Sequence, residues 1–177
     1  MVRWDEAGLM VPKMAVNLSV RQVERGAMAP QVARVLAETR LAPRRLQLEV
    51  TESVIMNTGD ALAFVHELHA IGVGLAIDDF GTGYSSLAYL KQLPVDVLKI
   101  DRSFIKDIAI DSNDEAIAIA IIQLGKSMNL SVIAEGVENE EQAAFLLRHG
   151  CTRAQGYLYG RPVAPAELLE NWGNKNN

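Results

Sequence analysis

Residues 74–83 read GLAIDDFGTG, and this stretch decides the fold. Its first part, Gly74–Ile77, is a short apolar run of strand length, which ends in the adjacent carboxylates Asp78 and Asp79. The segment before it carries apolar residues at helical spacing and stops at Gly72, a residue type that commonly ends a helix. The stretch is therefore predicted to be a buried strand that follows a helix and ends in polar side chains.

The same alternation of short strands and longer helices extends over the rest of the chain. In the helix before Gly74, Asp60 is the candidate N-cap. The candidate strands start roughly 20 to 35 residues apart, as βα units should. They are Ala15–Leu18, Leu46–Val50, Gly74–Ile77, Val97–Ile100, Ser131–Ala134 and Ala154–Leu158. Alternating strands and helices predict an α/β fold with a parallel sheet.

The composition is that of a globular domain. The chain has 177 residues, 49% of them hydrophobic, and we expect one domain over residues 1–177 with a polar tail at 173–177. The net charge of −5 argues against a nucleic-acid polymer as partner, since such binding needs a basic surface. Cys151 is the only cysteine, so no intrachain disulfide can form and a reducing cytoplasm is the expected location. The sequence shows no signal peptide, and its longest apolar run, Ala116–Ile122, is far shorter than the roughly 20 residues that span a bilayer, so we expect no membrane contact by this chain.

Polar side chains stand at or near the C-terminal end of every candidate strand. In a (β/α)8 barrel these ends meet on one face, and catalytic groups come from several strands at once. A single such residue is commonly a loop residue or a helix cap, but the repetition over successive strands favours a functional site. The residues are Asn17, Glu49, Asp78 with Asp79, Lys99 with Asp101, Glu135 and Gln155.

The chemistry of this set suits a hard divalent cation. Oxygen atoms of carboxylates and amides are the ligands that Mg²⁺ and Mn²⁺ prefer, and they are offered here by Asn17, Glu49, Asp78 and Asp79. The two adjacent aspartates cannot both stay ionised at low cost unless a cation lies beside them. Two neighbouring divalent ions are a known arrangement for phosphodiester cleavage. Lys99 would orient the nucleophile or stabilise phosphoryl charge, whereas the alternative of a surface lysine is less common at the end of an apolar strand.

Six motifs follow one another along the chain. They are VNLS at 16–19, LEVTES at 48–53, IDDFGTGYSS at 77–86, LKID at 98–101, AEGVE at 134–138 and QGY at 155–157. In order and spacing they resemble the successive signatures of EAL domains. The resemblance implies a TIM-type (β/α) barrel with one antiparallel strand. It also implies Mg²⁺- or Mn²⁺-dependent hydrolysis of cyclic di-GMP to the linear dinucleotide pGpG.

The resemblance further implies roles for individual residues. By motif, the metal ligands are Asn17, Glu49, Asp78 and Asp79, the last of them for a second metal. The residues that resemble groups holding or activating the attacking water are Lys99 and Glu135. Those that resemble groups assisting metal and ligand binding are Asp101 and Gln155. Glu52 resembles the residue that anchors the Asp79-Phe80-Gly81 loop rather than a direct ligand.

The sequence departs from the family at one motif. EAL domains carry a Glu-Ala-Leu-x-Arg strand before the Asn-x-Ser strand, with the Glu as a metal ligand and the Arg on a substrate phosphate. Glu6-Ala7-Gly8 is not that motif, so we expect an incomplete barrel with about six of the eight strands. An interrupted barrel exposes two edges, here near Asn17 and Gln155, and we expect a homodimer or a partner chain to cover the opening. The alternative is a monomer in which Met1–Lys13 fold across the gap.

Three functions remain open. The first is a cyclic di-GMP phosphodiesterase whose activity is impaired, because a hard-cation site without one carboxylate binds its metal more weakly. The second is a catalytically inactive cyclic di-GMP-binding or protein-interaction module. The third is another divalent-metal barrel enzyme with Lys99 as its base, which the six ordered motifs disfavour. Metal-dependent turnover of cyclic di-GMP separates the first two.

Overall fold

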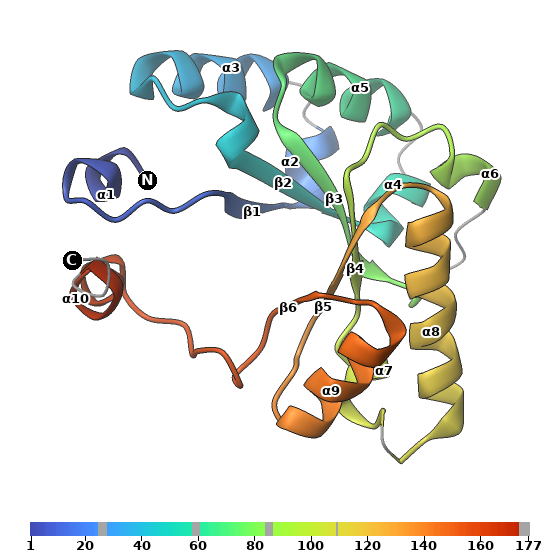
Figure 1. Cartoon of the computed structure of the whole chain (residues 1–177). Coiled ribbons are helices and arrows are strands. Elements are labelled where there is room, and N and C mark those ends of the chain that lie inside the picture. The colour runs from blue at the N-terminus through green and yellow to red at the C-terminus, as the bar shows by residue number, and fades with distance from the viewer. Residues whose placement is uncertain (25–27, 58–60, 84–86, 109, 174–177) are drawn as a thin grey trace.

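The computed structural model describes residues 1–24, 28–57, 61–83, 87–108 and 110–173. Its strands form one six-stranded sheet, in which every neighbouring pair is parallel and the strand order follows the chain (Figure 1). The strands are β1 (Met14–Leu18), β2 (Leu46–Thr51), β3 (Gly74–Phe80), β4 (Val97–Ile100), β5 (Ser131–Ala134) and β6 (Arg153–Ala154). The predicted α/β fold with a parallel sheet in barrel order is confirmed.

Helices separate successive strands and cover the outer side of the sheet (Figure 1). The longer ones are α3 (Met28–Thr39), α5 (Ala61–Ile71), α8 (Ser112–Ser127) and α9 (Glu140–His149). The shorter ones are α1 (Val2–Glu6), α2 (Val20–Glu24), the 3₁₀ helix η1 (Pro43–Arg45), α4 (Glu52–Asn57), α6 (Leu87–Leu90), α7 (Ser103–Lys106) and α10 (Pro165–Gly173). As predicted, α5 ends before Gly72, which has φ +89°. The proposed N-cap Asp60 lies outside the described residues. None of the described helices is long and apolar enough to cross a membrane.

The core lies between the sheet and the helices, and the central strands are its most buried part. All residues of β4 are buried, and so are all but one of β3. In β1, by contrast, the middle residues from Ala15 to Asn17 are exposed. Leu98 and Ile100 in β4 are 0% exposed, and full burial of such an aliphatic side chain contributes about 1.5–3 kcal/mol. The sheet is therefore anchored at its centre and least covered at β1.

The sixth strand is shorter than predicted. It contains only Arg153–Ala154 instead of the predicted Ala154–Leu158. Beyond it, the N–H of Leu158 donates to the carbonyl of Val137, at 3.1 Å, in the loop that follows β5. The apolar pattern did not reveal this because turn residues that pack against a neighbouring loop can be as hydrophobic as strand residues. Gln155 therefore stands just beyond the strand.

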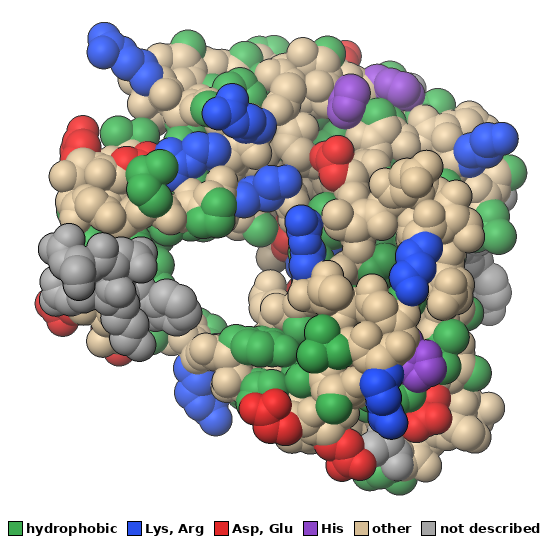
Figure 2. Space-filling model, in the orientation of Figure 1, with side chains coloured by type: hydrophobic (Ala, Val, Ile, Leu, Met, Phe, Trp, Pro, Cys, Tyr) green, Lys and Arg blue, Asp and Glu red, His purple; other side chains and the backbone are tan. Residues whose placement is uncertain are grey.

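The sheet has two edges, β1 and β6, which do not pair with each other among the described residues. The two ends of the chain meet across the opening, where Trp4 Nε1 of α1 donates to the carbonyl of Pro165 in α10, at 3.2 Å. Arg45 ties α1 to the start of β2 by two hydrogen bonds to Asp5, at 2.5 and 2.8 Å. Figure 2 shows a passage that remains between these terminal helices and the sheet. The N-terminal segment thus crosses the opening without filling it.

Candidate metal centre

A bulge in β3 brings two successive aspartates to the same neighbour. The pairing of β3 with β4 shifts between Ile77 and Phe80, so that Asp78 and Asp79 together oppose one residue, Lys99. Asp79 has φ +53°, a left-handed conformation that Asp adopts more readily than most residues. Side chains in a regular strand alternate between the two faces. The bulge removes this alternation, and both carboxylates enter one site.

Lys99 lies at the centre of this site. Its side chain is 4% exposed, and its ammonium contacts carboxylates that come from three neighbouring strand ends. They are Glu49 Oε2 at 2.6 Å, Asp78 Oδ1 at 2.9 Å and Glu135 Oε1 at 2.7 Å from Nζ. Burial acts to lower the pKa of Lys99, but the hydrogen bonds to these carboxylates outweigh it and raise the pKa. The side chain therefore stays an ammonium ion at any pH near neutrality.

Two of the carboxylates are shifted toward their protonated form. Burial raises the pKa of Glu135; Lys99 opposes this effect, and the charge of Asp78 adds to it. Burial also raises the pKa of Asp79, and the charges of Asp78 and Asp101 raise it further. Burial is the main cause of both shifts, and the neighbouring negative charges add to it. An added cation would favour the ionised form of both carboxylates.

Asn17 meets Glu49 across the β1–β2 pair. One end atom of its amide lies 3.2 Å from Glu49 Oε2 and 3.2 Å from Asp78 Oδ2. With the amide nitrogen at this position, Asn17 donates to both carboxylates. With the oxygen there, three oxygen atoms converge, which is a stable arrangement only around a cation. The amide can therefore either bridge the carboxylates or complete a set of hard donors.

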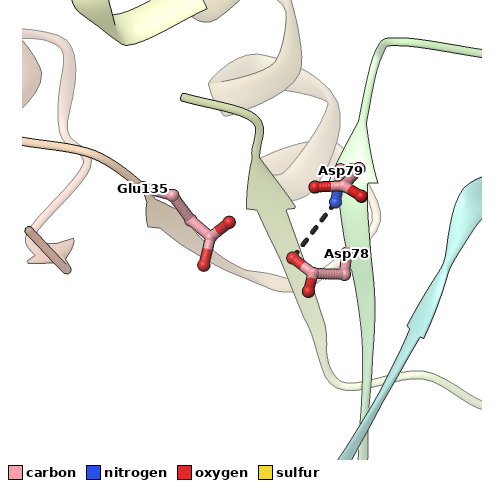
Figure 3. Close-up of side chains that lie close together, drawn as sticks. All are labelled: Asp78, Asp79 and Glu135. Carbon is pink, nitrogen blue, oxygen red and sulfur yellow. Dashed lines mark hydrogen bonds between the residues drawn. The ribbon is translucent and has the colours of Figure 1, made fainter. Parts of the chain in front are cut away.

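A second group of oxygen donors is formed by Asp78, Asp79 and Glu135. One oxygen of each lies within 4.8 Å of the others, and Figure 3 shows the carboxylate of Glu135 turned toward the two aspartates. The backbone N–H of Asp79 also donates to Asp78 Oδ1, at 3.1 Å. Oxygen atoms at this separation can close around an ion with metal–oxygen distances of about 2.0–2.6 Å. The residues present thus fit hard divalent cations.

A pocket of about 310 Å³ adjoins these carboxylates at the ends of β3 to β6. Its volume is at the lower end of the range for small-ligand sites. Four predicted site residues line it: Asp79, Asp101, Glu135 and Gln155. The lining residues that sequence reasoning did not single out are Arg102, Lys106, Gly136, Glu138, Gly156 and Tyr157. A signal for two of them was present, since Arg102 and Lys106 are cations four residues apart directly after Asp101.

Asp101 is mainly engaged with the start of α7. Its Oδ1 accepts hydrogen bonds from the backbone N–H of Ser103, at 2.9 Å, and from the Ser103 hydroxyl. Burial acts to raise the pKa of Asp101, but the bonds from Ser103 outweigh it and lower the pKa. The carboxylate thus holds α7 in place while it lines the pocket.

Glu52 lies outside the carboxylate cluster and holds the loop after β3. Its Oε2 accepts the backbone N–H groups of Gly81, at 2.9 Å, and Gly83, at 3.4 Å. Glu52 is 2% exposed, and its Oε1 has no hydrogen-bond partner among the described residues. A Cβ at position 83 would lie 2.9 Å from Oε1, so the loop approaches the carboxylate this closely only because Gly83 has no side chain. The following residues, 84–86, lie outside the described part of the chain.

The chain matches the family model for the EAL domain over residues 1–162. It is 50% identical over 167 residues to the bifunctional diguanylate cyclase/cyclic di-GMP phosphodiesterase MucR of Pseudomonas aeruginosa, a match that covers 94% of this chain and 24% of MucR. It is 46% identical over 159 residues to the cyclic di-GMP phosphodiesterase NbdA of the same organism, covering 89% of this chain and 20% of NbdA. The chain thus spans about a quarter or less of the length of these curated relatives.

Solved structures of related proteins share the fold. The MucR phosphodiesterase in complex with cyclic di-GMP matches with a TM-score of 0.90 at 48% identity, covering 95% of this chain and 68% of that one. The manganese/cyclic di-GMP complex of Klebsiella pneumoniae BlrP1 at pH 9.0 matches with a TM-score of 0.81 at 30% identity, covering 91% and 42%. The six parallel strands are accordingly part of a TIM-type barrel. The chain belongs to the EAL domain family.

Proposed function

We propose that this chain is the catalytic module of a cyclic di-GMP phosphodiesterase, which hydrolyses cyclic di-GMP to pGpG with the help of Mg²⁺ or Mn²⁺. One observation carries the proposal: carboxylate and amide groups from successive strand ends converge around Lys99 in a chain of the EAL family. The converging groups are Asn17, Glu49, Asp78, Asp79 and Glu135. Two relatives are named as cyclic di-GMP phosphodiesterases, and two related structures contain cyclic di-GMP.

The cations would be held by two overlapping sets of donors. Asn17, Glu49 and Asp78 would hold one ion, and Asp79 would serve a second. When bound, such ions stabilise charge on the attacking and leaving oxygens of the phosphodiester. Asp78 would belong to both sets, because it lies beside Asn17 and also forms a group with Asp79 and Glu135.

Glu135 would take the proton of the attacking water. A partly buried carboxylate with a raised pKa is suited to this role, because the raised pKa makes it a stronger proton acceptor. Lys99 holds the Glu135 carboxylate in place from 2.7 Å. The water oxygen then bonds to phosphorus, the bond from phosphorus to one 3′ oxygen breaks, and that oxygen takes up a proton. The ring of cyclic di-GMP opens to pGpG.

The adjoining pocket would hold part of the dinucleotide. Asp101 and Gln155 line it beside Glu135, and Arg102 and Lys106 supply positive charge for a phosphate or a guanine carbonyl. Glu52 would act only indirectly, by fixing the loop that carries Gly81 and Gly83.

Turnover by the purified chain tests the proposal. We expect chromatography to show pGpG in the presence of Mg²⁺ or Mn²⁺ and none in EDTA. Glu135→Gln should reduce turnover by about 10²-fold or more while cyclic di-GMP still binds, because a base acts on the transition state. His66→Ala, an exposed change on α5, is the matched control. Full turnover by Glu135→Gln, or equal turnover in EDTA, would overturn the assignment.

A second function is favoured by one specific feature. The strand β1 has one partner strand among the described residues, and its middle residues are exposed. A module that uses this edge to bind cyclic di-GMP or a partner protein would not need to cleave the ligand. Calorimetric binding of cyclic di-GMP without pGpG formation under every metal condition would favour this second function.

A further proposal concerns assembly. Among the described residues, β1 and β6 are the unpaired edges of the sheet, and such edges favour pairing with another chain. We therefore expect a homodimer or a partner chain over the opening. Sedimentation over a wide concentration range would show a dimer, whereas a compact monomer of 19.4 kDa at every concentration would reject this expectation.

A further inference from the structure

Lys99 places its ammonium among several carboxylates. Its ammonium is 2.6–2.9 Å from three carboxylates that belong to β2, β3 and the residue after β5. In the sheet, β4 pairs with β3 and β5 but not with β2, so the ammonium also reaches a carboxylate from a strand that is not its backbone neighbour. Almost no water reaches it, since the residue is 3% exposed.

The charges around Lys99 do not balance without a further cation. Four carboxylates gather here, and one ammonium faces them: the acids are Glu49, Asp78, Asp79 and Glu135. Unpaired carboxylates in a buried site repel one another and are costly to keep ionised. With an apolar residue at position 99, the four carboxylates would repel one another without a positive charge among them. The ammonium reduces this repulsion and keeps the carboxylates close together.

The ammonium also contacts one oxygen atom that lies beside Asn17. Glu49 Oε2 is 2.6 Å from Lys99 Nζ and 3.2 Å from the amide of Asn17. A divalent ion held by Asn17 and Glu49 would therefore share a donor oxygen with the ammonium, and the two positive charges would repel each other.

We propose that Lys99 is the resident cation of this site, which keeps the carboxylates assembled before a divalent ion binds and limits how tightly that ion is then held. This positioning role rests on the proposed metal site but not on the identity of the substrate. It predicts that a divalent ion can replace the lost ammonium, which a lysine that merely packs in the core would not allow.

The test uses Lys99→Met, which keeps an unbranched side chain one heavy atom shorter and removes its charge. In EDTA we expect the melting midpoint to fall by about 5 °C or more. Mn²⁺ should raise the midpoint of the variant by more than it raises that of the wild type. In calorimetry, Mn²⁺ should bind to the variant roughly tenfold more tightly than to the wild type, because the ammonium that repels the ion is gone. Lys91→Met, at an exposed lysine, is the matched control and should leave all three measurements unchanged.

A second variant covers the case in which Lys99→Met does not fold in EDTA. Lys99→Met combined with Glu135→Gln removes one positive and one negative charge, so it should be more stable in EDTA than Lys99→Met alone. The inference is overturned if Lys99→Met melts with the wild type in EDTA, if its Mn²⁺ affinity is unchanged or weaker, or if the double variant is no more stable than the single one. A wild-type chain that binds no Mn²⁺ would contradict the proposed function, while the melts in EDTA would still decide the role of Lys99.

Discussion

The middle of the sheet and its N-terminal edge contribute to the same site but are built differently. Asp78 and Lys99 stand on β3 and β4, which are buried along nearly their whole length between two neighbouring strands each. Asn17 stands on β1, which has one neighbour and three exposed residues in its middle. The charged part of the site is therefore held by the core, whereas the amide depends on a strand that little else supports. Substitutions at the centre of the sheet should therefore lower the free energy of unfolding more than substitutions at the edge do.

The largest effect is expected in the buried strand β4. Leu98→Ala should lower the free energy of unfolding by about 2–5 kcal/mol, because Leu98 is 0% exposed and a cavity would remain. Val16→Ala on β1, where the side chain is 43% exposed, should cost less than about 1 kcal/mol. Urea unfolding of both variants measures the two values. If Val16→Ala lowered the free energy of unfolding as much as Leu98→Ala does, another chain or segment would have to bury Val16 in solution.

An intermediate effect is expected at Gly156, at the other edge. A Cβ there would overlap the carbonyl oxygen of Val137, so Gly156→Ala must push the chain after β6 away from the loop after β5. We expect a loss of about 1–3 kcal/mol and a displacement of the neighbouring Gln155, seen as weaker cyclic di-GMP binding. Gly160→Ala, which meets no atom within 4 Å, should change neither. If Gly156→Ala binds cyclic di-GMP as tightly as the wild type does, Gln155 has no role in ligand binding in the proposed pocket.

The smallest effect is expected where α1 is attached. The hydrogen bond from Arg45 holds the pKa of Asp5 below its usual value of 3.8. A carboxyl with a lowered folded-state pKa stabilises the fold above its unfolded-state pKa and loses this contribution as the pH falls through the folded-state value. Asp5→Asn should therefore melt slightly below the wild type at pH 7; the difference should shrink below about pH 3.8 and vanish as the pH falls through the lower folded-state pKa. If the difference in melting midpoint grew as the pH fell, the predicted direction of the pH dependence would be wrong.

Much of the fold and the location of the site were predictable from the sequence. Each buried strand is a short apolar run, and the polar residue that ends it lies on the face where parallel strands end. Asn17, Glu49, Asp78, Lys99 and Glu135 could be grouped on that basis, and the structure brings them into contact. The grouping follows from the topology alone, because the C-terminal ends of all strands in a parallel sheet lie on the same side of the sheet.

The details that depend on local backbone geometry were not predictable. The alternation of a regular strand would send Asp78 and Asp79 to opposite faces, and only the bulge at φ +53° brings both to Lys99. The early end of β6 depends on packing between two loops, which apolar periodicity does not record. The contact of Trp4 with Pro165 joins residues 161 positions apart and leaves no local signal.

Calorimetric titration with Mn²⁺ tests most directly whether the strand ends form a divalent-metal site. We expect the wild-type chain to bind Mn²⁺ and Asp78→Asn to lose this binding, because Asp78 belongs to both groups of donors. His66→Ala should bind as the wild type does. Equal Mn²⁺ affinity in the wild type and Asp78→Asn would contradict the account.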